Sequence, residues 1–462
     1  MGKYFGTDGF RGEANENLTA DHAYKIGRFL GWYYGEQKRR NGDDTPARIV
    51  IGKDTRRSSY MFEYTLVGGL VASGADAYLL HVTTTPSVAY VARTDNFDCG
   101  IMISASHNPY YDNGIKLING NGEKMDEETI ALVEDYLDGK VEVFGETYEE
   151  VPYAHKDRIG CTVDYVAGRN RYVGYLISLG MYSFKGIKVG LDCANGSSWN
   201  IAKAVFDALG AKTYVINAQP DGTNINNNAG STHIEGLQKY VVDNGLDVGF
   251  AYDGDADRCL AVDEQGNLID GDQIMAACGL DRKEKGQLPG DTVVATVMSN
   301  LGLHVFAGEH GLKLECTSVG DRNVLERMQE KGYALGGEQS GHMIFLDYAT
   351  TGDGQLTALQ VLALLKESGK KASEVFGSCA RYPQVLINVP VASNDVKKAV
   401  MASDALWAAV RGEEEQLAGS GRVLVRPSGT EALIRVMVEA KTAETAKDVA
   451  SKLAEFIKAM KF

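Results

Sequence analysis

The chain has 462 residues, of which 44% are apolar and 24% charged, and it contains seven cysteines. This length is too great for one hydrophobic core, so three or four domains are expected from typical domain sizes of about 100–150 residues. The net charge of −15 argues against nucleic acid as a partner, because a nucleic-acid-binding surface is basic. A small anionic substrate is not excluded, provided that local arginines and backbone N–H groups bind it.

The sequence lacks the usual signals for export or membrane insertion. Its first residues, Met1 to Gly6, have no apolar signal-peptide core, and no apolar stretch is long enough to cross a bilayer. The cysteines are scattered singly, without a Cys-x-x-Cys pair, as in proteins of a reducing compartment. We therefore expect a cytoplasmic protein that does not contact a membrane.

Strand and helix patterns alternate along the first part of the chain. Short apolar runs at 47–53 and 77–82 indicate strands, with a helical pattern between them at 58–73. Thr85-Pro86 begins another helix, since proline is favoured in the first turn, and the apolar run at 99–104 follows. This alternation predicts a mixed or parallel sheet with helices on both faces.

Two further units repeat this alternation, and a different one follows them. The strands expected in the repeats are 186–192, 213–216, 247–253, 291–297 and 314–319. The helices expected there are 163–179, 197–209, 234–242 and 355–366. The last unit has strands at 385–389, 422–425 and 433–438 and helices at 396–410 and 442–460. We therefore expect three α/β domains at 1–158, 159–262 and 263–378, and an α+β domain at 379–462 with helices on one face of an antiparallel sheet.

The first candidate reactive group is the hydroxyl of Ser106, in a turn that ends the apolar run at 99–104. His107 is adjacent and Lys116 follows soon after, so an imidazole and an ammonium can lie near this hydroxyl. Serine is a weak nucleophile that needs activation by a base, a charge or a metal. The stretch alone is equally typical of an ordinary strand-ending turn, but three later stretches favour a phosphate group at Ser106.

Three carboxylates, Asp253, Asp255 and Asp257, alternate directly after a predicted strand. They can converge on one hard cation and leave room for a phosphate oxygen, as is usual for Mg²⁺. The stretch nearly matches the EF-hand calcium loop, but Arg258 stands where that loop requires glycine, and predicted strands flank it. We therefore reject an EF-hand and expect a Mg²⁺ site beside an anion. An acidic, solvated loop is the alternative.

A glycine-framed loop at 336–342 combines a carboxylate, an amide, a hydroxyl and an imidazole. Glycine lets the backbone approach a ligand closely, and the polar groups match the hydroxyls of a sugar. The candidate sugar-binding residues are Glu338, Gln339 and Ser340, and His342 follows them. An ordinary surface turn is the alternative.

The stretch at 426–431 has the composition of a phosphate-binding loop. Its candidate phosphate ligands are Arg426, Ser428, Gly429, Thr430 and, just beyond it, Arg435. The alternative is a proline-glycine hairpin turn with incidental polar residues. Another glycine-spaced loop, at 6–12, has the single cation Arg11.

Five stretches resemble, in order and spacing, the motifs of the α-D-phosphohexomutases. They are 6–12, 104–109, 253–258, 337–342 and 426–431, and the resemblance extends from Lys3 to the final helix. Within that family, the opening at 4–12 and Gln339 look like the bacterial phosphoglucosamine mutases, since phosphomannomutase/phosphoglucomutases typically have methionine at this position. Ala432 departs from the family, which usually has proline there. We expect this difference to alter the stiffness of the loop at 426–431 more than its chemistry.

The resemblance implies four domains around one cleft, with a loop from each. It implies an intramolecular phosphotransferase that carries Ser106 as phosphoserine and binds Mg²⁺ through Ser106, Asp253, Asp255 and Asp257. Ser106 would give its phosphoryl group to a sugar phosphate, forming a hexose bisphosphate that turns over in the cleft and returns its other phosphoryl group. The loop at 426–431 would bind the phosphate that is not reacting.

Four residues are candidates for proton transfer and charge stabilisation near the reacting oxygen, and the sequence does not rank them. They are Arg11, His107, Lys116 and His342. Arg258 is a further catalytic candidate, which together with the cation would balance the charge of the phosphoserine. The implied substrates are glucosamine 6-phosphate and glucosamine 1-phosphate, which feed the synthesis of UDP-N-acetylglucosamine and cell-wall precursors. Phosphoglucomutase/phosphomannomutase activity on neutral hexose phosphates is the alternative within the family. A non-catalytic sugar-phosphate sensor would be expected to lack Ser106 or a metal-loop aspartate, and this chain has all of them. We expect a monomer or a homodimer.

Overall fold

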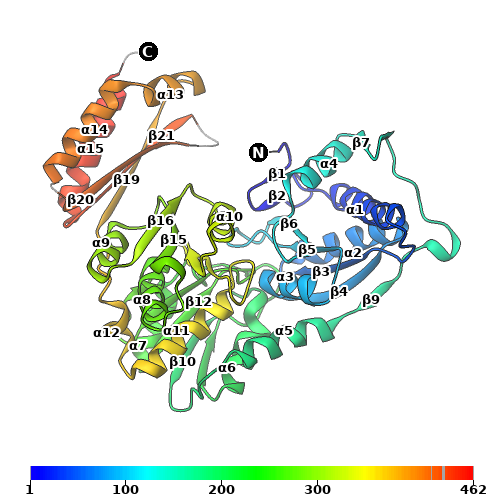
Figure 1. The fold of residues 1–462 in the computed structure, drawn as a ribbon, viewed down its shortest axis with the longest axis horizontal. Helices are drawn as coiled ribbons and strands as arrows, with labels where there is room; N and C mark the ends of the chain where they lie inside the picture. The colour runs from blue at the N-terminus through cyan, green and yellow to red at the C-terminus, as the bar shows by residue number, and fades with distance from the viewer. Residues whose placement is uncertain (1, 418, 429–431, 461–462) are drawn as a thin grey trace. The chain divides into compact units, whose positions relative to one another are not determined.

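The computed structural model describes residues 2–417, 419–428 and 432–460, which fall into two compact units. The first unit comprises the chain up to Met298 together with Leu312–Gly377, and the second comprises Ser299–Gly311 and the chain from Ser378 onward. The first unit contains mixed sheets of seven, five and four strands, and the second contains a three-stranded antiparallel sheet (Figure 1).

The seven-stranded sheet has the order β1-β2-β6-β5-β3-β4-β9. Its region consists of β1 (Phe5–Gly6), β2 (Gly9–Glu13), α1 (Ala20–Arg40), β3 (Arg48–Lys53), α2 (Arg57–Ala72), β4 (Asp76–Val82), α3 (Thr85–Thr94), β5 (Cys99–Ile103), β6 (Asp112–Asn119), α4 (Glu127–Leu137), the ribbon β7 (Val141–Val143) and β8 (Glu146–Tyr148), and β9 (Thr162–Asp164). Strand β3 is parallel to β4 and β5, whereas β6 is antiparallel to β5 and β2.

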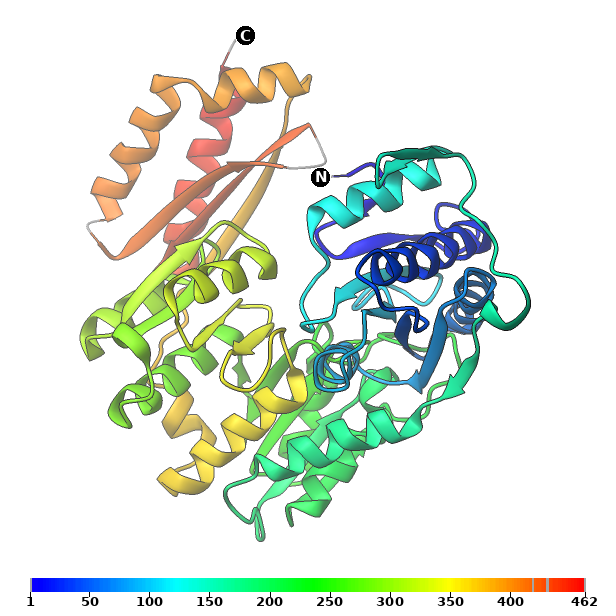
Figure 2. The same cartoon turned by 45° about the vertical axis from the view of Figure 1, so that its right-hand side comes forward.

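The apolar run of β3 is buried on both faces of this sheet. Ile49 and Ile51 contribute to the core beneath α1 and α2, whereas Val50 contributes to the core beneath α3. Successive side chains of a strand point to opposite faces, so a strand covered on both sides is apolar throughout. Figure 2 shows helices on both sides of the blue and cyan sheet, as predicted.

The five- and four-stranded sheets have the orders β11-β10-β12-β13-β14 and β16-β15-β17-β18. The elements around the first are α5 (Val166–Ser178), β10 (Lys188–Asp192), α6 (Ala202–Ala208), β11 (Lys212–Ile216), α7 (Glu235–Asp243), β12 (Val248–Tyr252), β13 (Cys259–Asp263) and β14 (Leu268–Ile269). Those around the second are α8 (Gly271–Glu284), β15 (Thr292–Thr296), β16 (Lys313–Thr317), α10 (Asp321–Lys331), β17 (Leu335–Gly337), β18 (Met343–Phe345), α11 (Gly354–Ser368) and α12 (Ala372–Phe376). Short 3₁₀ turns lie at Lys156–Arg158, Ser197–Asn200 and Pro289–Asp291.

The three larger sheets of the first unit share one connection. A strand with a parallel neighbour on one side, β5, β12 or β17, continues directly into an antiparallel partner on the other side, β6, β13 or β18. We call these connections the hairpin loops. They hold the predicted motifs at 104–109, 253–258 and 337–342, so equivalent positions of the three sheets carry the candidate chemistry.

The second unit has the sheet order β19-β21-β20. Its elements are α9 (Leu301–His310), β19 (Gln384–Pro390), α13 (Asn394–Met401), α14 (Asp404–Leu417), β20 (Gly421–Pro427), β21 (Leu433–Ala440) and α15 (Ala443–Ala459). The single helix expected at 396–410 is wrong, because α13 ends at Met401 and α14 begins at Asp404. The predicted fold class, three α/β units followed by an α+β unit with an antiparallel sheet, is confirmed.

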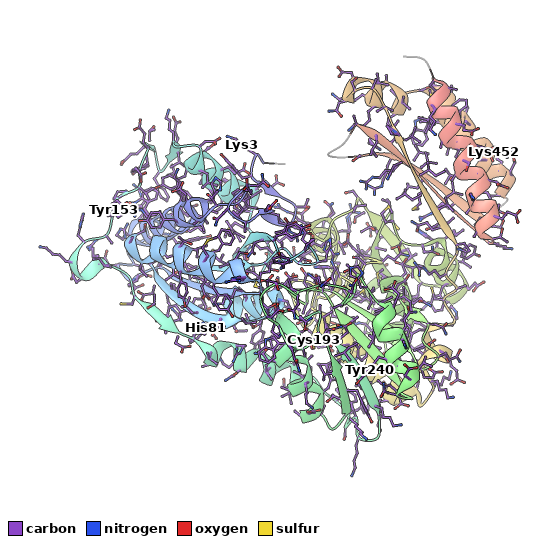
Figure 3. The ribbon with its side chains drawn as sticks, turned by 180° about the vertical axis from the view of Figure 1, so that it is seen from behind. Lys3, His81, Tyr153, Cys193, Tyr240 and Lys452 are labelled. Atoms are coloured by element: carbon purple, nitrogen blue, oxygen red, sulfur yellow. The ribbon has the colours of Figure 1, made fainter. Side chains whose placement is uncertain are left out.

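Five of the seven cysteines are buried. Cys193, labelled in Figure 3, is one of them. Within the described ranges, no helix is long and apolar enough to cross a bilayer.

Candidate active site

Ser106 lies in the hairpin loop between β5 and β6 and is 1% exposed. Its backbone has a φ of +52°, a left-handed conformation that is uncommon for residues other than glycine. The Oγ atom donates a hydrogen bond to Asp253 Oδ2 at 2.6 Å and lies 3.3 Å from His107 Nδ1. The serine hydroxyl therefore lies between the Asp253 carboxylate and an imidazole.

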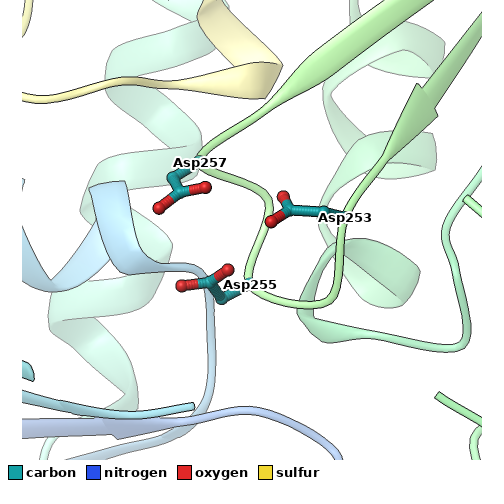
Figure 4. A group of neighbouring side chains, drawn as sticks. All are labelled: Asp253, Asp255 and Asp257. Atoms are coloured by element: carbon teal, nitrogen blue, oxygen red, sulfur yellow. The ribbon is translucent and has the colours of Figure 1, made fainter. Parts of the chain in front are cut away.

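The three aspartates of the β12–β13 hairpin loop converge (Figure 4). Asp253, Asp255 and Asp257 are buried, and one oxygen of each lies within 4.8 Å of the others. Strands, not helices, flank the loop, which confirms the rejection of an EF-hand. Within the described part of the chain, Asp255 Oδ1 and Asp257 Oδ1 are buried without a hydrogen-bond partner. Such a set of hard oxygens fits a divalent cation such as Mg²⁺.

Burial and mutual repulsion shift the pKa values of this acidic cluster. Burial, together with the charges of Asp257 and Asp255, raises the pKa of Asp253 well above its usual value. Burial also favours the neutral form of Asp257, but Lys116, His342 and Arg258 lower its pKa to about 2. The cluster therefore combines a carboxyl group that resists ionisation with one that is firmly ionised, and added positive charge would stabilise it.

Lys116 supplies one such charge from β6. Its Nζ lies 2.5 Å from Asp255 Oδ2 and 3.1 Å from Asp257 Oδ2. Burial opposes the charged ammonium, but the two carboxylates raise the pKa of Lys116. The ammonium is therefore held in the cluster, on the strand that follows Ser106 in the chain.

Arg258 and Arg11 set the electrostatics around His107. Arg258 Nη1 lies 3.5 Å from His107 Nδ1, and the Arg258 N–H donates to Asp253 Oδ1 at 3.2 Å. Burial lowers the pKa of His107, and Arg258 and Arg11 lower it further. The imidazole is therefore neutral at neutral pH and able to exchange a proton with the neighbouring hydroxyl.

The candidate sugar-binding loop is hydrogen-bonded to its surroundings. Glu338 Oε1 accepts from the Gly320 N–H at 3.1 Å, and Glu338 Oε2 lies 3.5 Å from Ser340 Oγ. The Gln339 amide donates to Asp270 Oδ2 at 3.3 Å, at the N-terminus of α8. The Gly341 carbonyl accepts from the backbone N–H of Cys259 at 3.0 Å, which ties this loop to the start of β13.

A second ion-pair cluster, which no motif of the sequence predicts, lies beside His342. Lys124 Nζ contacts Asp8 Oδ1 at 3.1 Å and Asp321 Oδ1 at 2.6 Å, and His342 Nε2 lies 3.4 Å from Asp321 Oδ2. Lys116, Asp257 and three of these residues, Asp8, Lys124 and Asp321, line a pocket of about 430 Å³. The glycine before Asp321 is only a weak indication of a functional loop. Lys124 lies in an acid-rich stretch that contains no motif.

The candidate phosphate-binding residues lie in the second unit, around the β20–β21 connection. Arg426 and Arg435 are directly opposite each other in the antiparallel pair, and Ser428 is buried. Burial and the charge of Arg435 lower the pKa of Arg426. Like charges directly opposite each other destabilise a strand pair, so an anion bound at this place would relieve their repulsion. The other two predicted ligands, Gly429 and Thr430, are outside the described residues.

Four domain families match almost the whole chain. They are described as phosphoglucomutase/phosphomannomutase alpha/beta/alpha domain I at residues 2–143, domain II at 170–266, domain III at 270–382 and the C-terminal domain at 386–456. The chain belongs to the phosphoglucomutase/phosphomannomutase family. Members of this family of phosphohexomutases are intramolecular phosphotransferases of the isomerase class, so this chain is one as well.

Similar family members share one name. Proteins called phosphoglucosamine mutase from Lachnospira eligens and Lachnoclostridium phytofermentans are 61% and 59% identical to the chain, over 99% and 97% of both sequences. One from Streptococcus pneumoniae is 48% identical over 96% of each. A solved structure of a phosphoglucomutase/phosphomannomutase family protein from Burkholderia thailandensis has a TM-score of 0.78 at 22% identity, covering 99% of both chains. The phosphohexomutase fold and the resemblance predicted from the motifs are thereby confirmed.

Proposed function

We propose that the chain interconverts glucosamine 6-phosphate and glucosamine 1-phosphate through a phosphoserine at Ser106. The observation that carries the chemistry is the Ser106 hydroxyl, 2.6 Å from Asp253 in a buried cluster of three carboxylates. The choice of sugar is supported by the name phosphoglucosamine mutase, which relatives with 48–61% identity share. We propose that it acts in the cytoplasm on free sugar phosphates.

Asp253, Asp255 and Asp257 would hold Mg²⁺, which when bound supplies positive charge to a phosphoryl group on Ser106. In the first half-reaction, the free hydroxyl oxygen of the sugar phosphate forms a bond to phosphorus, and the bond between phosphorus and Ser106 Oγ breaks. The sugar hydroxyl loses its proton, and Oγ regains one. The second half-reaction runs this exchange in reverse from the other phosphate of the bisphosphorylated sugar, which restores phosphoserine.

The residues around Ser106 suit this transfer, which depends mainly on positioning and charge neutralisation. His107, neutral and 3.3 Å from Oγ, is placed to exchange the proton there. Lys116 and Arg258 would neutralise the charge of the transferring group. Arg11 and His342 remain predicted site residues. Whether either of them exchanges a proton with the sugar depends on the orientation of the bound sugar.

The phosphate that does not react would be bound by Arg426, Ser428, Gly429, Thr430 and Arg435. The amino group of the sugar would be bound in the β17–β18 hairpin loop. Glu338 is our preferred acceptor for that ammonium, and Ser340 would bind a hydroxyl. Because the Gln339 amide donates to Asp270, we propose that Gln339 fixes the shape of the loop.

Steady-state kinetics with three substrates test the substrate assignment. We expect kcat/KM for glucosamine 1-phosphate to exceed that for glucose 1-phosphate and mannose 1-phosphate on one phosphorylated sample. A site that hydrogen-bonds one group rejects an analogue lacking it more strongly than shape alone allows. Intact-mass measurement should show one added phosphoryl group, located on Ser106. A higher kcat/KM for either neutral sugar would overturn the substrate assignment and favour phosphoglucomutase/phosphomannomutase activity. The same comparison on Gln339→Met tests whether Gln339 contributes to the preference for the amino sugar.

A further inference from the structure

The backbone carbonyls of the Ser106 loop are bound by two side chains from different parts of the chain. Arg56 Nη2 donates to the carbonyl oxygens of Ser106 and Asn108 at 3.1 and 2.6 Å. Asn226 Nδ2 donates to the same two oxygens at 2.8 and 3.1 Å. Each carbonyl therefore accepts two hydrogen bonds, one from the region of β3 and α2 and one from the loop before α7.

This double contact coincides with an unfavourable backbone conformation. Ser106 has a φ of +52°, which an L-residue other than glycine adopts only at a cost in free energy. Its N–H donates to Ser104 Oγ at 2.9 Å, and its Oγ faces Asp253. Turning the peptide to an ordinary conformation would carry both the carbonyl and the hydroxyl away from these partners. The contacts to the carbonyls therefore hold the hydroxyl toward the carboxylate cluster.

Asn226 is itself built firmly into the fold. It is 6% exposed, has a φ of +58°, and its N–H donates to the Ala194 carbonyl at 2.9 Å. The β12–β13 hairpin loop packs against the same place, since a Cβ added at Gly254 would lie 2.4 Å from the Ser106 carbonyl oxygen and 3.0 Å from Asn226 Nδ2. Because both neighbouring oxygens are acceptors, only the NH₂ end of the amide suits this position.

We infer that Asn226, together with Arg56, is a positioning residue that holds Ser106 in its left-handed conformation with Oγ directed at Asp253. This inference rests on the proposed role of Ser106 as the phosphorylated residue. Asn226 acts through the loop backbone, so its loss should slow phosphoryl transfer and leave sugar-phosphate binding nearly unchanged.

The test compares Asn226→Gly with Asn228→Gly. Both asparagines have positive φ, +58° and +49°, so glycine relieves the backbone equally, but Asn228 is exposed. We expect kcat of Asn226→Gly to fall about tenfold to a hundredfold, because small misplacements of a reacting group have effects of this size. KM for the sugar phosphate should stay within about twofold of wild type, and Asn228→Gly should keep both constants. Asn226→Asp, which points acceptors at the two carbonyls, should be slower than Asn226→Gly.

Thermal unfolding of each variant separates folding from positioning, since a purely structural role would lower the midpoint without changing kcat of the folded protein. If Asn226→Gly does not fold, Asn226→Ser takes its place in the comparison. A folded variant with wild-type kcat, or one altered only in KM, would overturn the inference. Ser106→Ala is assayed alongside. Wild-type turnover in Ser106→Ala would refute the proposed function, whereas an inactive Ser106→Ala beside a fully active Asn226→Gly refutes only the role of Asn226.

Discussion

Asp353 gives the chain a pH-dependent stability that one substitution should remove. Its side chain is buried and accepts a hydrogen bond from the Leu356 N–H at 3.0 Å, at the N-terminus of α11. The Tyr172 hydroxyl, from α5, donates to both carboxylate oxygens at 3.0 and 2.9 Å. Burial raises the pKa of Asp353 from 3.8 to about 6, although these hydrogen bonds oppose the shift.

The sign of the effect follows from the raised pKa. The folded state binds this proton more tightly than the unfolded state, so its stabilising contribution is complete below pH 3.8 and is lost as the pH rises through about 6. A shift from 3.8 to about 6 corresponds to about 3 kcal/mol in the free energy of unfolding. About 1.4 kcal/mol of this is lost between pH 5 and pH 8.

Asp353→Asn keeps an oxygen for the helix cap and for Tyr172 but does not titrate. We expect the stability of wild type minus that of Asp353→Asn to decrease by about 1.4 kcal/mol from pH 5 to pH 8, or about 1–2 °C in the unfolding midpoint. Differential scanning calorimetry at both pH values measures this difference. The matched control is Asp126→Asn, the same substitution at the exposed N-cap of α4. A difference between wild type and Asp353→Asn that does not change with pH would refute the reasoning.

Three substitutions test the proposed chemistry. Ser106→Ala should lower kcat by about a thousandfold or more with little change in the unfolding midpoint, because the group that carries the phosphoryl is lost. Near-normal turnover would contradict a phosphoserine. Asp255→Asn should raise the Mg²⁺ concentration needed for half-maximal activity about tenfold to a hundredfold. Addition of a chelator should abolish the activity of the wild type. Activity of a washed sample in chelator would exclude the proposed metal. Arg426→Lys keeps the charge but loses the two-pronged geometry of guanidinium, so KM should rise about tenfold for the 1-phosphate and the 6-phosphate alike. A defect limited to one of them would argue against a shared phosphate site.

The elements that could be predicted are those with a recognisable pattern within a short stretch of sequence. The apolar runs of β3, β5, β10 and β12 and the motifs that follow β5 and β12 were placed correctly because a strand buried on both faces is apolar along its length. The prediction of a cation site likewise came from a local pattern, the alternating aspartates at 253–257.

Helix α1 was not predicted, and its glycines explain why. Gly27 lowers helix propensity by about 1 kcal/mol relative to alanine, yet a Cβ at this position would lie 2.2 Å from the Leu66 carbonyl of α2. The glycine is therefore required by the close approach of two helices, which no local pattern shows. Asn226 and Lys124 were missed for a related reason, since their partners Ser106 and Asp321 are distant in sequence.

The three hairpin loops occupy equivalent positions in their sheets, but different functions are proposed for them. Phosphoryl chemistry is proposed for the loops after β5 and β12, and sugar choice for the loop after β17, each fixed at both ends by strands of its own sheet. The loops also contact one another, since Ser106 Oγ donates to Asp253 and the Cys259 N–H donates to the Gly341 carbonyl. A substitution in the β17–β18 loop can therefore change the proposed preference for a sugar without disturbing phosphoryl transfer only where it keeps the Gly341–Cys259 contact.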